Sequence, residues 1–234
     1  MASHFLGPVR NRPKNEGLRA WYSNLPLGLG ETDLIQYWND FLFAQNYSGS
    51  DWVVTETDAN ATQAIAADEV GGALLLTNTA ADNDIVQLQS AEEWFKLTAG
   101  KRAWFKARFK VSDATQSDLF VGFATTDTSI IAGTTDAVGF RKADGSTSLK
   151  SLTEDNTTET ENTAVTMADD TYVSVAFYWD GIATVRFYVN DSLTASHTAN
   201  IEQTNKLALT VCLQNGEAVA KTMTVDYIGA WLER

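Results

Sequence analysis

This sequence of 234 residues has few of the residues that mark disulfide-rich, metal-binding or membrane-spanning proteins. Its single cysteine, Cys212, excludes an internal disulfide and a cysteine metal cluster. With only two histidines, His4 and His197, histidine-rich metal sites and most histidine-based catalysis are disfavoured. The longest stretch without a charged residue, 70–81, holds 12 residues, whereas a membrane helix needs about 20. The sequence therefore predicts no membrane-spanning helix and no membrane partner.

Proline and charge are unevenly distributed along the chain. All three prolines, Pro8, Pro13 and Pro26, lie at the N-terminal end, and the first 20 residues carry a net charge of +3. The whole chain carries −13, so the remainder carries −16. Because proline fixes φ and disfavours helix at the residue before it, residues 1–30 are predicted to form an extended arm. The arm lacks the long apolar core of an export signal.

From about residue 35 the hydrophobic pattern has the period of two that is typical of β-strands. Residues 102–111 place apolar side chains on one face and mostly basic ones on the other. Asp180-Gly181 separates two alternating runs, 171–179 and 182–189, which is typical of a β-hairpin. On the C-terminal strand, one face is predicted to hold Met223, Val225, Tyr227 and Trp231.

More short strands complete the pattern. They are predicted over residues 52–57, 73–78, 85–89, 119–126, 137–142 and 206–213. Residues 33–43 fit either a short helix or a strand. More than ten strands without alternating helices predict an all-β fold, an antiparallel jelly-roll sandwich over residues 31–234 that follows the extended arm.

The hairpin at residues 185–193 resembles a strand–turn–strand unit of concanavalin A-like and laminin-G-like jelly rolls. In those folds a strand that ends in Tyr-Val-Asp or Tyr-Val-Asn runs into a turn and a short return strand. Residues 172–179 and 225–228 also resemble the last third of that fold. The resemblance implies a concanavalin A-like body.

At the level of the whole chain, a basic arm before an acidic, proline-free sandwich is similar to capsid decoration (cement) proteins and head fibres of tailed bacteriophages. This resemblance implies a non-enzymatic virion structural protein on the outer capsid surface. It would bind the major capsid protein and assemble as a homo-oligomer, with a trimer favoured. The arm residues expected to contact the capsid are Phe5, Leu6, Arg10, Arg12, Lys14, Arg19, Trp21 and Tyr22.

Motifs for catalysis are missing. Retaining glycosidases of this fold carry Glu-x-Asp-x-x-Glu or Glu-x-Asp-x-Glu on one strand, and the sequence has neither. The nearest approach, Glu159-Thr160-Glu161, lies in the acidic stretch 153–162. We predict that this stretch is a solvated loop in which burial raises no carboxyl pKa. The sequence also has no Gly-x-Ser-x-Gly pentapeptide.

Other reactive side chains have structural interpretations. His197 is expected in a loop, Cys212 as a buried inert thiol, and Asp226 as a hydrogen-bonded structural aspartate. The acidic turns 82–84 and 169–170 offer the oxygen ligands that Ca²⁺ takes, as in some laminin-G-like proteins, but both are ordinary turn sequences. The sequence therefore predicts no catalytic residue, no metal site and no cofactor, and the protein is not expected to be an enzyme.

The most distinctive surface is a basic strand in which Trp104 lies between cations, with Lys106 and Arg108 on the same face. The favoured interpretation is that these cations pair with acids on neighbouring strands. A contact between subunits through an exposed Trp104 is the second interpretation, and a glycan contact is the third. The charge of −16 on the body argues against nucleic acid as a partner.

Three functions remain after these exclusions. The leading hypothesis is a capsid decoration protein. The alternative is a carbohydrate-binding module or receptor-binding fibre domain on the same fold, with Trp104 or another exposed aromatic residue as its platform. A degenerate enzyme of the glycosidase fold is the third and weakest.

Overall fold

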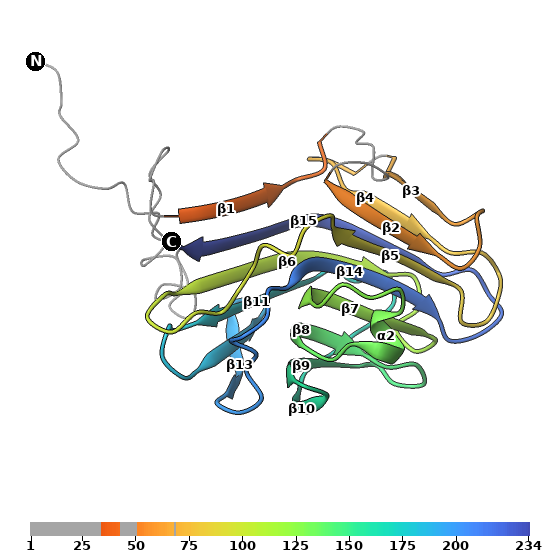
Figure 1. Ribbon diagram of the computed structural model, residues 1–234. Helices are drawn as coiled ribbons and strands as arrows, with labels where there is room; N and C mark the ends of the chain where they lie inside the picture. The colour runs from red at the N-terminus through yellow and green to blue at the C-terminus, as the bar shows by residue number, and fades with distance from the viewer. Residues whose placement is uncertain (1–33, 43–50, 68) are drawn as a thin grey trace, which may run out of the picture.

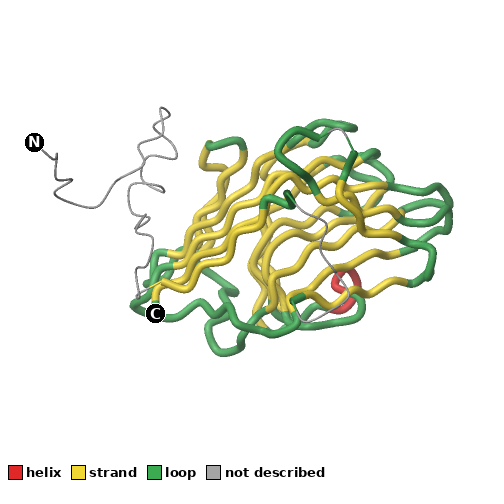
Figure 2. The backbone as a smooth tube through the Cα atoms, turned by 90° about the horizontal axis from the view of Figure 1, so that it is seen from above, coloured by secondary structure: helices red, strands yellow, loops and turns green. Residues whose placement is uncertain are grey.

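The computed structural model describes residues 34–42, 51–67 and 69–234. They form two antiparallel β-sheets stacked face to face, with loops gathered at the strand ends (Figure 1, Figure 2). The prediction of an all-β antiparallel jelly-roll sandwich is confirmed. The predicted arm, residues 1–30, lies outside the described residues.

The first sheet has eight strands in the order β13-β12-β11-β6-β15-β4-β3, and β1 also pairs with β15. Its strands are β1 (Leu34–Asn39), β3 (Thr62–Ile65), β4 (Leu74–Thr77), β6 (Ala103–Val111), β11 (Val173–Trp179), β12 (Val185–Val189), β13 (Ser192–His197) and β15 (Thr222–Glu233).

The second sheet has seven strands in the order β10-β9-β8-β7-β14-β5-β2. Its strands are β2 (Trp52–Glu56), β5 (Ile85–Ser90), β7 (Ser117–Ala124), β8 (Ala137–Lys142), β9 (Ser148–Asp155), β10 (Thr158–Thr166) and β14 (Ala208–Asn215). A single helical turn, α2 (Ile130–Gly133), packs against β7 and β14. It covers the outer face of this sheet, where Ile130 is buried beside Phe120.

The core lies between the sheets and is rich in phenylalanine. The rings of Phe105 on β6 and Phe177 on β11 stack with centroids 5.2 Å apart, and Phe123 on β7 meets Phe105 edge-on at 5.6 Å. These contacts follow from the alternation of side chains along each strand, which the sequence predicts for β6. Burial of each such ring stabilises the fold by about 1.5–3 kcal/mol.

The segment 33–43, for which the sequence fits either a helix or a strand, contains a strand, β1. The hairpin predicted at Asp180-Gly181 is confirmed, but its loop is longer than two residues. The Asp180 carboxylate accepts hydrogen bonds from the backbone N–H groups of Ile182, Ala183 and Thr184 at 2.9–3.1 Å. The tight two-residue turn joins β12 to β13 instead, where Asn190 and Asp191 both have positive φ.

A β-bulge interrupts β15 between Val225 and Tyr227. Because the extra residue, Asp226, shifts the alternation by one position, Ile228 faces the core and Tyr227 faces outward. The prediction that Met223, Val225, Tyr227 and Trp231 share one face is therefore wrong for the last two.

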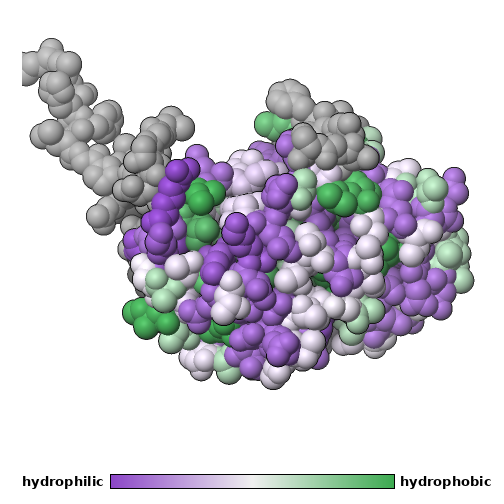
Figure 3. Space-filling view, in the orientation of Figure 1, coloured by the Kyte–Doolittle hydropathy of each residue, from purple (hydrophilic) through white to green (hydrophobic). Residues whose placement is uncertain are grey.

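No helix among the described residues is long and apolar enough to span a membrane. Figure 3 shows one side of the molecule as mostly hydrophilic, with small separate hydrophobic patches.

Candidate functional site

An aromatic pocket of about 220 Å³ opens at the rim of the sandwich, where β1 and β2 lie at the edges of the two sheets. We call it the rim pocket. Three aromatic residues line it, together with polar groups and Leu209; the lining residues are Tyr37, Asp51, Trp52, Ser90, Ala91, Glu92, Trp94 and Leu209.

The rings of the rim pocket hold one another in place. Tyr37 meets Trp52 edge-on with centroids 6.0 Å apart, and it lies 6.5 Å from Trp94. Trp94 in turn packs edge-on against Phe95 and Phe123 of the core, at 5.9 and 5.8 Å. The pocket therefore has an apolar wall that is fixed from behind by the core.

Polar groups stand beside these rings. The Tyr37 hydroxyl accepts a hydrogen bond from the Asn39 amide at 3.2 Å, and burial raises the pKa of Tyr37, so that the phenol keeps its proton. Asp51 and Glu92 are exposed at the mouth. An apolar wall with a few oriented polar groups is the usual composition of a small-molecule site.

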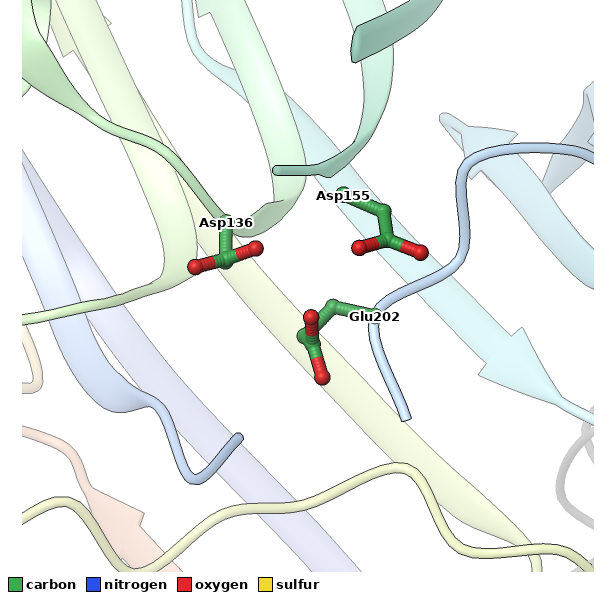
Figure 4. A group of neighbouring side chains, drawn as sticks. All are labelled: Asp136, Asp155 and Glu202. Carbon is green, nitrogen blue, oxygen red and sulfur yellow. The ribbon is translucent and has the colours of Figure 1, made fainter. Parts of the chain in front are cut away.

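A second group of polar side chains lies where β8 begins and β9 ends. One carboxylate oxygen each of Asp136, Asp155 and Glu202 lies within 4.8 Å of the other two (Figure 4). Asp136 immediately precedes β8, Asp155 ends β9, and Glu202 lies between β13 and β14. Carboxylate oxygens are the ligands that Ca²⁺ takes. Among the described residues, this cluster has the composition that could hold such an ion.

Hydrogen bonds and burial shift the pKa values of two of these carboxyls, Glu202 and Asp155, in opposite directions. Burial opposes ionisation of Glu202, but its Oε1 accepts hydrogen bonds from the Thr204 hydroxyl and the Asn205 N–H, and these bonds lower its pKa. Burial and the neighbouring Glu202 and Asp136 raise the pKa of Asp155. Glu202 therefore ionises more readily than a free glutamate, and Asp155 less readily than a free aspartate.

The acidic stretch 153–162 is not a solvated loop. It forms most of the β9–β10 hairpin, which turns at Asn156 and Thr157, both with positive φ. Glu154 is only 2% exposed and lies opposite Glu159. Burial, and then the charge of Glu159, raise the pKa of Glu154 to about 7.

Arg141 on β8 organises the acids of this hairpin. Its guanidinium donates to both oxygens of Glu159, at 2.8 and 2.5 Å, and to Glu161, which also pairs with Lys150 at 2.7 Å. A shallow hollow of about 170 Å³ lies beside these groups, lined by Asp118, Ile131, Arg141, Lys142, Ala143, Lys150 and Glu161. The Glu154 Oε2 atom has no hydrogen-bond partner in the described part of the chain.

The predicted pairing of the basic strand is confirmed. Arg108 pairs with Asp226, Lys106 lies 3.9 Å from Asp191, and Lys110 pairs with Glu69 at 2.8 Å. The pairs run between neighbouring strands, or from a strand to a loop, as expected for a sheet face.

Trp104 is not the exposed platform that the sequence suggests. Its side chain is fully buried, with its ring 5.6 Å from that of Tyr178 and packed in a cluster with Leu34, Tyr188 and Trp231. Large neighbours on β1, β11, β12 and β15 cover it, and a pattern of period two cannot reveal such cover. Within the described residues its Nε1–H finds no acceptor.

The remaining reactive side chains are structural. His197 ends β13 instead of lying in a loop, and its ring nitrogens contact the Ser151 and Thr153 hydroxyls at 3.1 and 3.0 Å. Burial lowers the pKa of His197 to about 4, so the imidazole is neutral at pH 7. Cys212 is buried, as predicted, and burial raises its pKa. Asp226 accepts a hydrogen bond from Arg108, as predicted.

The two acidic turns considered for Ca²⁺ do not form that site. Asp84 accepts hydrogen bonds from the Thr57 and Thr79 hydroxyls, at 2.6 and 2.7 Å, and Asp169 accepts one from the Ala114 N–H. The carboxylate cluster that does form joins residues far apart in the sequence, so spacing cannot reveal it. The rim pocket was missed for the same reason, although its aromatic residues are visible in the sequence. The arm residues Phe5 to Tyr22 lie outside the described residues.

Comparison with known proteins finds the same jelly-roll fold in solved structures. No protein-family model matches the chain, and no curated protein matches its sequence. The endo-1,3-beta-glucanase from Streptomyces sioyaensis superposes with a TM-score of 0.63 and 12% identity, covering 88% of this chain and 99% of the glucanase. The beta-glucanase of Bacillus licheniformis has a TM-score of 0.59 and 14% identity, over 83% of this chain and 97% of its own.

A carbohydrate recognition domain has the same architecture. That of Emp46p, in its potassium-bound form, has a TM-score of 0.58 and 9% identity, with coverage of 82% of this chain and 94% of the domain. At these identities the likeness shows the concanavalin A-like fold alone.

The two glucanases overturn the prediction that the chain is not an enzyme, because enzymes that cleave glucans are built on this same fold. That prediction rests on the absence of the expected carboxylate motif. It is wrong because a motif on one strand does not reveal carboxyls that the fold brings together from different strands. The comparisons lend no support to a role in a phage capsid.

Proposed function

We propose that this protein binds a carbohydrate in the rim pocket. The observation that carries the proposal is the pair of partly exposed rings Tyr37 and Trp94, backed by the buried Trp52, beside two exposed carboxylates in one hollow. Aromatic faces pack against the apolar C–H face of a sugar ring, while charged oxygens accept strong hydrogen bonds from its hydroxyls. The glucanases and the carbohydrate recognition domain of the same fold make a glucan the first ligand to test.

The experiment measures binding of soluble β-1,3-glucan and mixed-linkage β-glucan oligosaccharides by isothermal titration calorimetry. Trp94→Ala is expected to weaken binding at least about tenfold, because it removes the ring that lies between pocket and core. Glu92→Gln, at an exposed residue, is expected to weaken it by about threefold without affecting folding. Val53→Ala is the matched control, since Val53 neighbours Trp52 but is exposed.

Equal affinity of Trp94→Ala, Glu92→Gln and the unmodified protein for these oligosaccharides would contradict the pocket. So would the absence of binding to any member of a wider panel of neutral and acidic glycans.

Cleavage of a carbohydrate at a different place, the β9–β10 hairpin near the other edge of the seven-stranded sheet, is a second candidate, favoured by one observation. Burial raises the pKa of Glu154 to about 7, and Glu154 lies directly opposite Glu159, which pairs with Arg141. Glycosidases use two carboxyls in different roles, one to donate a proton and one to stabilise positive charge. Release of reducing ends from β-glucans that disappears in Glu154→Gln would support this candidate. An unchanged rate in that variant would exclude it.

The virion hypothesis stays a prediction that concerns residues outside the described part. It expects residues 1–30 to bind a major capsid protein, and a homo-oligomer to strengthen that binding through effective concentration. Deletion of residues 1–30 should then abolish binding to purified capsids, whereas the Trp94→Ala variant should bind capsids normally. No nucleic acid or membrane partner is proposed.

A further inference from the structure

The outer face of the eight-stranded sheet carries a second aromatic surface, formed by Trp38, Tyr227 and Trp231 and called here the outer platform. The ring centroids of Trp38 and Tyr227 lie 5.1 Å apart with planes only 24° from parallel. Trp231 lies 5.9 Å from Trp38 on the other side. Trp38 is 50% exposed, an unusual amount for so large an apolar ring.

The backbone explains why these rings lie side by side. Trp38 on β1 is in register with Gly229 on β15, between the outward-facing Tyr227 and Trp231. A Cβ atom at Gly229 would come within 2.5 Å of the Trp38 ring and 2.7 Å of the Trp231 ring. Glycine therefore lets both rings approach the sheet. The bulge at Asp226 turns Tyr227 and Trp231 to this face in the first place.

Charges around the outer platform are balanced. Within the described part of the chain, five cations of this face have a carboxylate partner: Arg102 with Glu233, Lys106 with Asp191, Arg108 with Asp226, Lys110 with Glu69, and Arg186 with Asp180. Such a face attracts a polyanion weakly, because its positive charge is neutralised locally. It does offer donors and acceptors beside flat apolar rings, which suits a neutral, hydroxyl-rich ligand.

Strand β1 connects this surface to the rim pocket. Tyr37 and Trp38 are consecutive, so their side chains point to opposite sides of the strand. Tyr37 lines the pocket, and Trp38 forms the centre of the platform. The two aromatic surfaces are therefore separated by the thickness of a single strand.

We propose that the outer platform is a second carbohydrate-binding surface, which takes a neutral polysaccharide chain, and that the rim pocket takes a short oligosaccharide. The inference rests on the proposed function for the class of ligand, but on different residues. Two weak sites on one protein raise its apparent affinity for a polymer that can reach both.

The experiment compares polymer with oligosaccharide. Retention on insoluble β-1,3-glucan particles is measured by depletion from solution, and binding of a soluble β-1,3-glucan oligosaccharide by calorimetry. Trp38→Ala is expected to lower particle affinity at least about tenfold and to leave the oligosaccharide affinity unchanged. Trp38→Tyr should retain most of the particle affinity, because it keeps an aromatic face. The matched control is Leu193→Ala, which removes another exposed apolar side chain of the same sheet.

The outcomes separate the two proposals. Particle binding lost in Trp38→Ala but kept in Trp94→Ala supports the platform even if the pocket fails. Particle binding unaffected by Trp38→Ala overturns the platform, whether or not the pocket binds oligosaccharide. A dimer in light scattering that Trp38→Ala converts to a monomer, without an effect on particle binding, also overturns it, because the platform would then bind a second copy.

Salt dependence supplies an independent check. Binding of a neutral chain should be nearly equal at about 0.05 M and about 0.5 M NaCl, since no counterions are released. A steep loss of particle binding with salt would overturn the assignment of a neutral ligand.

Discussion

The outer face of the eight-stranded sheet and the β9–β10 hairpin of the seven-stranded sheet both carry acids and bases, but at different depths. On the first, cations such as Arg108 and Lys110 pair with carboxylates while both partners stay partly exposed. On the second, Glu154 is almost fully buried and its pKa rises to about 7. Depth, more than the number of charges, therefore decides how far burial shifts the pKa of a group and changes its effect on stability.

Substitution of Trp104 tests whether the stability of the eight-stranded sheet depends on packing more than on its ion pairs. Trp104→Ala should lower the free energy of unfolding by about 3–5 kcal/mol, because the buried indole leaves a cavity. Trp104→Phe should lower it much less, since it removes a buried Nε1–H that has no acceptor among the described residues. Urea unfolding measures both. Equal losses in the two variants would contradict the role of packing, because Trp104→Phe keeps most of the buried ring.

The next effect concerns the buried acid. Below its ordinary pKa of 4.5, Glu154 is protonated in both the folded and the unfolded chain. Above pH 4.5 Glu154 ionises in the unfolded chain, but in the folded chain it stays largely protonated until the pH rises through about 7. The stability contributed by Glu154 is therefore lost over this range, by up to about 3 kcal/mol. Glu154→Gln should remove this loss. A stability difference between variant and parent that is the same at pH 4 and pH 8 would contradict the raised pKa.

His197 should act in the opposite direction. Its pKa falls from 6.5 to about 4 on folding, so its contribution is complete above pH 6.5 and is lost as the pH falls through about 4. The maximum loss is of similar size, about 3 kcal/mol. Because Glu154 and His197 oppose each other between about pH 4 and 7, the parent should show a shallow pH dependence there. In Glu154→Gln, chemical unfolding should show a steep loss in acid, and in His197→Gln it should not.

The smallest effect belongs to the exposed pairs. Lys110→Ala removes the partner of Glu69 and should change the free energy of unfolding by less than about 1 kcal/mol, since both side chains are partly solvated. The same variant should differ even less from the parent in 1 M salt. A loss of several kcal/mol would show that exposed ion pairs affect stability as much as the buried acid does.

Strand patterning reveals most of this fold and little of its sites. The alternation in β6 and the strand–turn–strand of β12 and β13 are local, and local sequence predicts both correctly. The bulge at Asp226 is invisible to a count of period two, because the same residues fit an uninterrupted strand. The acidic stretch 153–162 has the composition of a solvated loop. Its own sequence does not show that Glu161 pairs with Arg141 and Lys150, which lie outside the stretch.

Both candidate surfaces depend on contacts between distant segments. Tyr37, Trp52 and Trp94 come from three parts of the chain, and only the pairing of the sheets brings them together. The same holds for the burial of Trp104 under residues of β1, β11, β12 and β15. Sequence alone identifies aromatic residues but not which of them other side chains cover.

The position of β15 has a consequence for how the protein folds. β15 pairs with β6, β4 and β1, so the middle of its sheet comes from the part of the described chain that lies furthest along the sequence from β1. Among the described strands β1 pairs only with β15, and the loop that must close between them spans nearly the whole described chain. Folding is therefore expected to be slow, and to leave strand edges open to aggregation until β15 is in place.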